Sequence, residues 1–143
     1  MREYKFRGKR IDNGEWACGD LVRDMSFDPH TLPVKCAICW DNDYIPVDTK
    51  TVGQYTGLSD RNGVEVYEGD IVESNHRVYD GGEVRLNEIV FTGYCWKLRH
   101  RDKYVADAPI GLYANESDNT APHIVLVGNV HTHPHLLEQG EME

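Results

Sequence analysis

The stretch Gln54–Glu73, QYTGLSDRNGVEVYEGDIVE, decides the fold class of this 143-residue chain. Its turn dipeptides, Asn62-Gly63 and Gly69-Asp70, separate short runs in which apolar and polar residues alternate. A period of two predicts β-strands, and an asparagine–glycine pair favours a tight hairpin turn. The stretch therefore predicts paired strands, and none of its residues is arranged to hold a reacting group.

The same period continues on both sides of this stretch, so the predicted class is mainly β. Before it we expect strands over 3–7, 15–22, 34–40 and 44–47, with turns at 12–14 and 41–43 and a loop over 25–33. After it we expect strands over 71–73, 83–91, 94–101 and 124–131, and one helical turn over 134–139. Residues 105–122 have no clear period, and we interpret them as a long excursion.

Composition is typical of one soluble globular domain, with 40% hydrophobic and 27% charged residues. The sequence has no apolar run of about 18 residues, which excludes a membrane-spanning helix. The amino terminus is charged and lacks the apolar core of a secretion signal, so we expect a cytoplasmic protein. In that compartment the four cysteines are expected to be thiols.

Charge argues against a general nucleic-acid binder, because the net charge is −9 and phosphate binding needs clustered positive charge. Basic residues nevertheless gather in the first ten residues and again along a later run. The later run is Lys97, Arg99, Arg101 and Lys103. One strand face with these residues could meet phosphate, but a solvated face or a charge-protected edge strand is the preferred interpretation.

Three blocks of the sequence resemble, in order, those of the YopX family of phage and prophage proteins. They are MREYKFRGKRIDNGEWACGDLV at 1–22, VDTKTVGQYTGLSDRNGVEVYEGDIV at 47–72 and VLVGNVHTHPHLL at 125–137. The resemblance implies a single YopX-like domain over 1–143. In it, a small β subdomain at about 1–53 precedes an SH3-like barrel at 54–143, whose first strands lie in 67–91. It brings no catalytic residues, because the family resembled is uncharacterised.

The closing block departs from the family pattern at His131, His133 and His135, so any chemistry there would be particular to this chain. His131-Thr132-His133-Pro134 matches the core of a zinc isopeptidase motif, but no serine or aspartate follows Pro134 to complete that site. His131 and His133, with His123 or His135, could still bind zinc or nickel. Solvated histidines are the preferred interpretation.

Cys36-Ala37-Ile38-Cys39 is a lone CxxC motif, whereas structural zinc sites need four ligands. On a strand its two thiols point to opposite faces, and Cys18 and Cys95 are far away in sequence, so ordinary packing is the preferred interpretation.

Other residues also have a structural and a functional interpretation. Asp20 and Asp70 each follow a glycine and are expected to bond turn backbone rather than to catalyse. Trp16, Trp40 and Trp96 could form a ligand or base-stacking surface, but are more typical of a core or a subunit interface.

These observations assign no catalytic, cofactor-binding or metal-ligating residue, and we expect no cofactor and no membrane association. The preferred hypothesis is a non-enzymatic phage or prophage accessory protein. It would act through contacts with an unknown protein partner or with copies of itself. The alternative is a nucleic-acid-binding module that uses the SH3-like barrel. A metal-dependent hydrolase at the histidine cluster ranks last.

Overall fold

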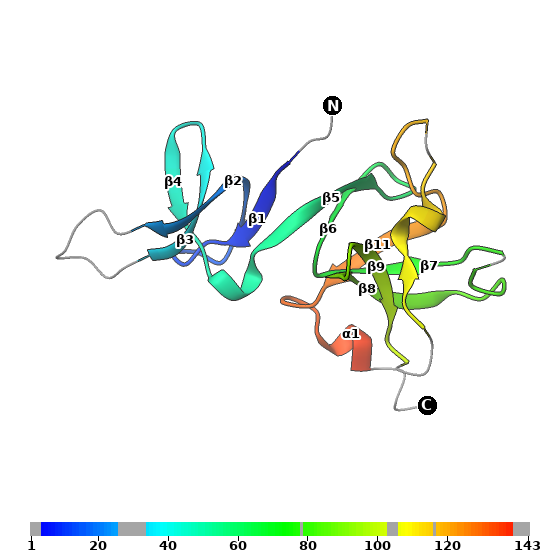
Figure 1. Cartoon of the computed structure of the whole chain (residues 1–143). Coiled ribbons are helices and arrows are strands. Elements are labelled where there is room, and N and C mark those ends of the chain that lie inside the picture. The colour runs from blue at the N-terminus through cyan, green and yellow to red at the C-terminus, as the bar shows by residue number, and fades with distance from the viewer. Residues whose placement is uncertain (1–3, 26–33, 78, 103–105, 116, 139–143) are drawn as a thin grey trace. The chain divides into compact units, whose positions relative to one another are not determined.

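The computed structural model describes residues 4–25, 34–77, 79–102, 106–115 and 117–138, and these residues are mainly β (Figure 1). The expected loop over 25–33 lies outside them, apart from Met25. The chain divides into two compact units, 1–55 and 56–143. The strand β5 (Gly53–Ser59) contains both this division and the boundary expected after residue 53.

The first unit is an antiparallel sheet with the strand order β4-β3-β2-β1-β5. Its strands are β1 (Phe6–Lys9), β2 (Trp16–Met25), β3 (Val34–Trp40), β4 (Asp43–Pro46) and the start of β5, which follows a 3-10 turn, η1 (Thr49–Thr51). Strand β2 pairs with β1 up to Gly19 and with β3 from Asp20 onwards. A β-carbon on Gly19 would collide with the carbonyl oxygen of Cys39, so this position needs glycine.

One face of this sheet holds the apolar core of the first unit. The buried members are Ala17, Cys36, Ile38 and Val47. On the other face, cationic side chains lie over aromatic rings: the Arg7 guanidinium is 4.5 Å from the Trp16 ring centroid, and Lys5 Nζ is 4.9 Å from that of Tyr55. The alternation of β1 therefore separates a packed face from a charged face.

The second unit contains a five-stranded antiparallel sheet with the order β10-β9-β8-β7-β11. Its strands are β7 (Asp70–Ser74), β8 (Arg85–Thr92), β9 (Cys95–His100), β10 (Ala108–Pro109) and β11 (Ile124–Asn129), and the short β6 (Glu65–Tyr67) adjoins β5. The core is formed by Val66, Val72, Ile89, Leu98, Ile110, Tyr113, Ala121 and Ile124. Within the described ranges no closed barrel is found.

The interpretation of 105–122 as an excursion without regular structure is wrong in part. The segment contributes β10 and a 3-10 turn, η2 (Ile110–Tyr113), and it buries Ile110, Tyr113 and Ala121 in the core. A strand of two residues and a turn of four are too short to show a hydrophobic period, which explains the error.

The expected helical turn near the carboxyl end is confirmed as α1 (His135–Glu138). The turn comes close to the sheet at Gly128, where an added β-carbon would lie 2.9 Å from both His133 Nδ1 and Leu136 Cδ1. No helix in the described part of the chain is long and apolar enough to cross a membrane.

Candidate functional site

The histidines of the closing block lie in and just after the turn that follows β11. Asn129 organises this turn, because its Oδ1 accepts the backbone N–H groups of His131 at 2.9 Å and Thr132 at 3.0 Å. The half-buried His133 lies against Gly128, and its Nδ1 accepts the backbone N–H of Asn129 at 3.3 Å. His133 therefore helps to hold the turn against the end of β11.

These contacts do not assemble a metal site. The ring centroids of His133 and His135 are 6.2 Å apart, while His123 instead contacts His76, with ring centroids 4.9 Å apart. Among the residues that the structure describes, no three His, Cys, Asp or Glu side chains are grouped so as to hold a metal ion. His123 therefore packs against His76, whereas His133 packs near His135.

The cysteines of the CxxC motif lie on β3. Cys36 is opposite Arg23 in the β2–β3 register and is buried in the first core, whereas Cys39 is opposite Asp20 and half-buried. Their positions alternate across the strand, so the two thiols face opposite sides of the sheet. All four cysteines of the chain are free thiols.

Buried aspartates stabilise turns in the second unit. Asp60 Oδ1 accepts the backbone N–H groups of Asn62 and Val64, and its Oδ2 accepts that of Leu126, all at 2.9 Å. Asp70 Oδ2 accepts the N–H of Tyr67 at 2.7 Å, which confirms the expected bond to turn backbone. For Asp20 the expectation is wrong, because this exposed residue lies inside β2 and not at a turn.

A third buried aspartate, Asp80, belongs to a polar network that the sequence does not reveal. Its Oδ1 accepts the hydroxyl of Tyr113 at 2.9 Å, and its Oδ2 accepts the backbone N–H of His76 at 2.7 Å. Nearby, Asn87 Nδ2 donates to Ser74 Oγ at 2.9 Å. Burial, reinforced by Asp80, raises the pKa of Tyr113, in keeping with a hydroxyl that donates to the Asp80 carboxylate.

Three rings, those of His76, Tyr79 and Tyr113, contact one another beside this network. The His76 ring centroid lies 4.4 Å from that of Tyr79 and 5.8 Å from that of Tyr113. At these distances the rings are in van der Waals contact, so the His76 ring packs on both tyrosines. The only sequence signals were the turn at Asp80-Gly81-Gly82 and an isolated tyrosine in a segment without a period.

The basic stripe expected along 97–103 is shorter and better compensated in the structure. Strand β9 ends at His100, and Lys103 lies outside the described residues. Arg99 Nε is 3.6 Å from Asp107 Oδ2, and Arg99 is opposite Glu88 in the β8–β9 register. Burial raises the pKa of Glu88, an effect that Arg99 opposes. This face therefore carries mixed charge.

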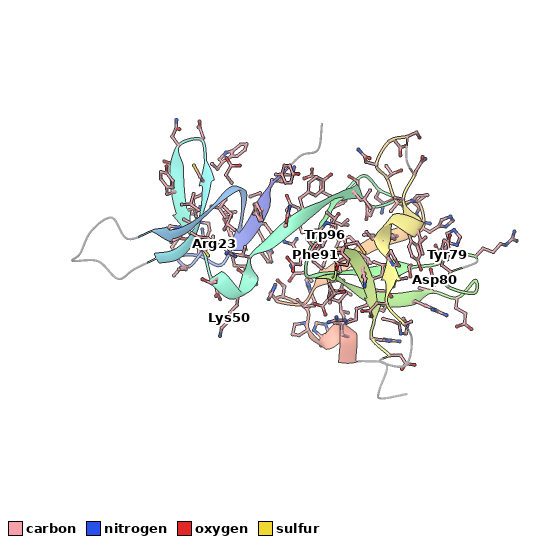
Figure 2. The ribbon with its side chains drawn as sticks, viewed as in Figure 1. Arg23, Lys50, Tyr79, Asp80, Phe91 and Trp96 are labelled. Carbon is pink, nitrogen blue, oxygen red and sulfur yellow. The ribbon has the colours of Figure 1, made fainter. Side chains whose placement is uncertain are left out.

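Exposed aromatic side chains distinguish the far end of the same hairpin. Phe91 is 50% exposed and Tyr94 is fully exposed, while Trp96 packs partly against the core. The rings of Phe91 and Trp96 meet edge to face, with centroids 4.8 Å apart. Figure 2 labels Phe91 and Trp96 at this end, and Tyr79 and Asp80 beyond the other end of β8. We call residues 90–97 the β8–β9 arm.

The other tryptophans differ from one another. Trp16 is half-buried beneath Arg7 and Lys9, whereas Trp40 is 66% exposed at the end of β3. A place in the core is therefore the wrong interpretation for Trp40.

Comparison with known proteins identifies the relatives of this chain. The family model described as YopX protein matches residues 5–138. The chain belongs to the YopX family. The crystal structure of protein EF1440 from Enterococcus faecalis resembles this chain with a TM-score of 0.50 and 19% identity, covering 96% of this chain and 99% of that one. No curated protein matches.

In this member of the YopX family, the buried polar groups described above are engaged in structure. Asp60 and Asp70 hold backbone N–H groups, and Asp80 holds both an N–H and the Tyr113 hydroxyl. A nucleophile or a general base must be able to reach a substrate, and carboxylates this deeply buried are not placed to do so. Exposed aromatic residues lie on the β8–β9 arm and also on the β3–β4 hairpin, where Trp40 and Tyr44 are 66% and 55% exposed. Of these residues, Tyr94 in the arm is the most exposed.

Proposed function

We propose that this YopX-family chain is a non-enzymatic protein-interaction module and a phage or prophage accessory protein. The observation that carries the proposal is the exposure of Phe91 and Tyr94 beside Trp96 on one hairpin. Aromatic residues dominate the energetically important parts of protein interfaces, and contiguous exposed apolar patches mark interaction sites. The four free thiols agree with a proposed location in the reducing cytoplasm of the host cell.

A non-enzymatic role is proposed because the buried aspartates already accept hydrogen bonds from the backbone. Each buried aspartate accepts hydrogen bonds that hold a turn, and the Tyr113 hydroxyl donates to Asp80. A metal-dependent hydrolase at the histidine cluster remains the least favoured function, since His133 Nδ1 is occupied by the backbone of Asn129.

We further propose that the second unit is a relative of the SH3-like barrel that the family resemblance implies. The support is a run of short antiparallel strands around one apolar core, with a 3-10 turn between the last two strands. In this proposal the short β6 and the turn at Asp60 occupy the position where a barrel would close.

Nucleic-acid binding through the second unit is the alternative function. Its support is the pair Lys97 and Arg99 on β9. Glu88 and Asp107 compensate that charge, and the net charge of −9 opposes phosphate binding. Titration of DNA and RNA binding against salt tests this alternative, because phosphate contacts produce affinity that falls steeply with salt.

The proposed function is tested by affinity capture from host cells in which the phage or prophage is active. Bait with Phe91→Ser and Tyr94→Ser should lose the specific partner that the unchanged bait retains. Bait with Trp40→Ser, which removes an exposed tryptophan from the first unit, is the matched control and should retain it. Equal capture by all three baits would refute the assignment of the interaction to the arm.

A further inference from the structure

The β8–β9 arm extends beyond the strands that flank it. Strand β7 pairs with β8 only as far as Glu88, and β10 pairs with β9 only at Lys97 and Leu98. Within the arm, Val90 pairs with Lys97, Phe91 with Trp96 and Thr92 with Cys95. Among the described residues, no strand pairs with β8 beyond Ile89 or with β9 before Lys97. The helical turn α1 approaches β8, so the outer edge of β9 is the one that can accept a further strand.

The tip of the arm is a two-residue turn that fixes its geometry. Gly93 has a positive φ of 66°, whereas the φ of Tyr94 is negative. This combination is typical of a type II′ hairpin turn. This turn type matches the twist of the flanking strands, so the arm is a formed hairpin. Tyr94 points away from its own fold, with its whole side chain exposed.

Charge separates the arm from the rest of the chain. Residues 90–97, VFTGYCWK, contain one lysine and no acidic residue, whereas the chain as a whole carries a net charge of −9. Two copies of so acidic a protein repel each other wherever acidic surfaces meet. A segment without negative charge allows two copies to touch there with little electrostatic repulsion.

We infer that the partner of the arm is the arm of a second copy of this chain, in a two-fold contact. The inference rests on the proposed interaction function and names its partner. In such an isologous contact the same residues meet on both sides, and an apolar hairpin whose β9 edge is open before Lys97 is self-complementary in this way. Phe91, Tyr94 and Trp96 of each copy would form the centre.

The size of the arm limits the strength of this dimer. A fully buried aromatic side chain covers about 150–250 Å², so the exposed parts of three would bury roughly 300–400 Å² per copy. Stable interfaces bury roughly 800 Å² per partner, about twice as much. We therefore expect a weak, concentration-dependent dimer with a dissociation constant on the order of 100 µM.

Sedimentation equilibrium over a concentration range that brackets this constant tests the inference. The mass should rise from that of one chain toward that of two, and Tyr94→Ser with Phe91→Ser should weaken association by about tenfold or more. Tyr94→Ser alone cannot disturb the core, so its smaller effect separates lost contact from misfolding. Trp40→Ser should associate as the unchanged chain does.

Salt and cross-linking give independent readouts. Raising salt from about 0.05 M to about 0.5 M screens repulsion between the acidic copies and should strengthen the dimer. A short bismaleimide should trap dimers through Cys95, which lies in the arm, so Cys95→Ser should abolish them. Cys18→Ser, which removes an exposed thiol of the first unit, should leave them unchanged.

The possible outcomes separate this inference from the proposed function. A strict monomer that still captures a cellular partner through Phe91 and Tyr94 would overturn the inference and leave the function standing. A monomer whose captured proteins ignore the arm would overturn both. A dimer that persists in the double variant, or that cross-links through Cys18, would place the contact elsewhere and reject the arm.

Discussion

Asp60 shows how one side chain can connect distant parts of the second unit. Its two oxygens accept three backbone N–H groups, two in its own turn and one from Leu126 in β11. The carboxylate is 1% exposed, so its oxygens are satisfied by these backbone groups rather than by water. The side chain therefore joins its own turn to β11, through Leu126, which lies 66 residues after Asp60.

Replacing Asp60 should cost more than replacing an exposed aspartate in a similar turn. Asp60→Ala removes the acceptor of three N–H groups, two from the exposed Asn62 and Val64 and one from the half-buried Leu126. It should lower the free energy of unfolding by about 2–3 kcal/mol. Urea denaturation measures the change.

Asp118→Ala is the matched control, because Asp118 is exposed and accepts only from Thr120. It should cost less than about 1 kcal/mol. Equal losses in the two variants would contradict the role given to Asp60.

The residues of the candidate sites were only partly predictable. Asp70 could be assigned because glycine before aspartate is local turn chemistry. Asp80 could not, because its partner Tyr113 lies 33 residues away and only folding brings the two together. The exposure of Phe91 was also hidden, since alternation along a strand does not tell where a neighbouring strand ends.

Turns decided how well the elements could be predicted. Strand β3 has the expected bounds, and β7 begins at Gly69-Asp70 as those residues indicate. The hairpin expected from strands over 83–91 and 94–101 is present, but it turns one residue later, at Gly93-Tyr94. Strand β10 and η2 were missed, because they are held by contacts with β9 and the core rather than by local chemistry. Turn residues in the sequence thus predict the hairpins, whereas elements held by tertiary packing, such as β10 and η2, cannot be predicted from local sequence.

Gly128 controls the packing of α1 on the sheet. Gly128→Ala should push His133 and Leu136 away, since its β-carbon would lie 2.9 Å from each, and should lower the free energy of unfolding by about 1–3 kcal/mol. Hydrogen exchange at the Asn129 N–H, which His133 Nδ1 accepts, should become faster.

Gly111→Ala is the control for this substitution. Its added β-carbon would meet no atom within 4 Å, and its φ is not positive. It should leave exchange at Asn129 unchanged. Protection of that amide to the same degree in both variants would show that α1 does not depend on the close approach.

For the molecule as a whole, the free energy of unfolding depends on pH through His100. Burial lowers the pKa of His100, and Arg85 and Arg101 act in the same direction while Asp102 opposes them. The folded chain then binds this proton less readily than the unfolded chain. The resulting stability is fully present above the ordinary histidine pKa of about 6.5 and is lost as pH falls through that value toward the lowered one.

His100→Gln should therefore reduce the loss of stability between about pH 7.5 and pH 5.5. Urea denaturation at both values measures the difference, with His135→Gln as a control that changes an exposed histidine. If the two variants lose as much stability on acidification as the unchanged chain does, burial of His100 has no thermodynamic consequence.

The free position of Tyr94 has a consequence for the evolution of the chain. Its side chain contributes nothing to folding, because all of it lies in solvent, and Phe91 is constrained only on one side. Selection on the fold acts instead on residues such as Asp60 and Gly128. Mutations at the hairpin tip can thus change the proposed interaction surface while the scaffold beneath is inherited unchanged.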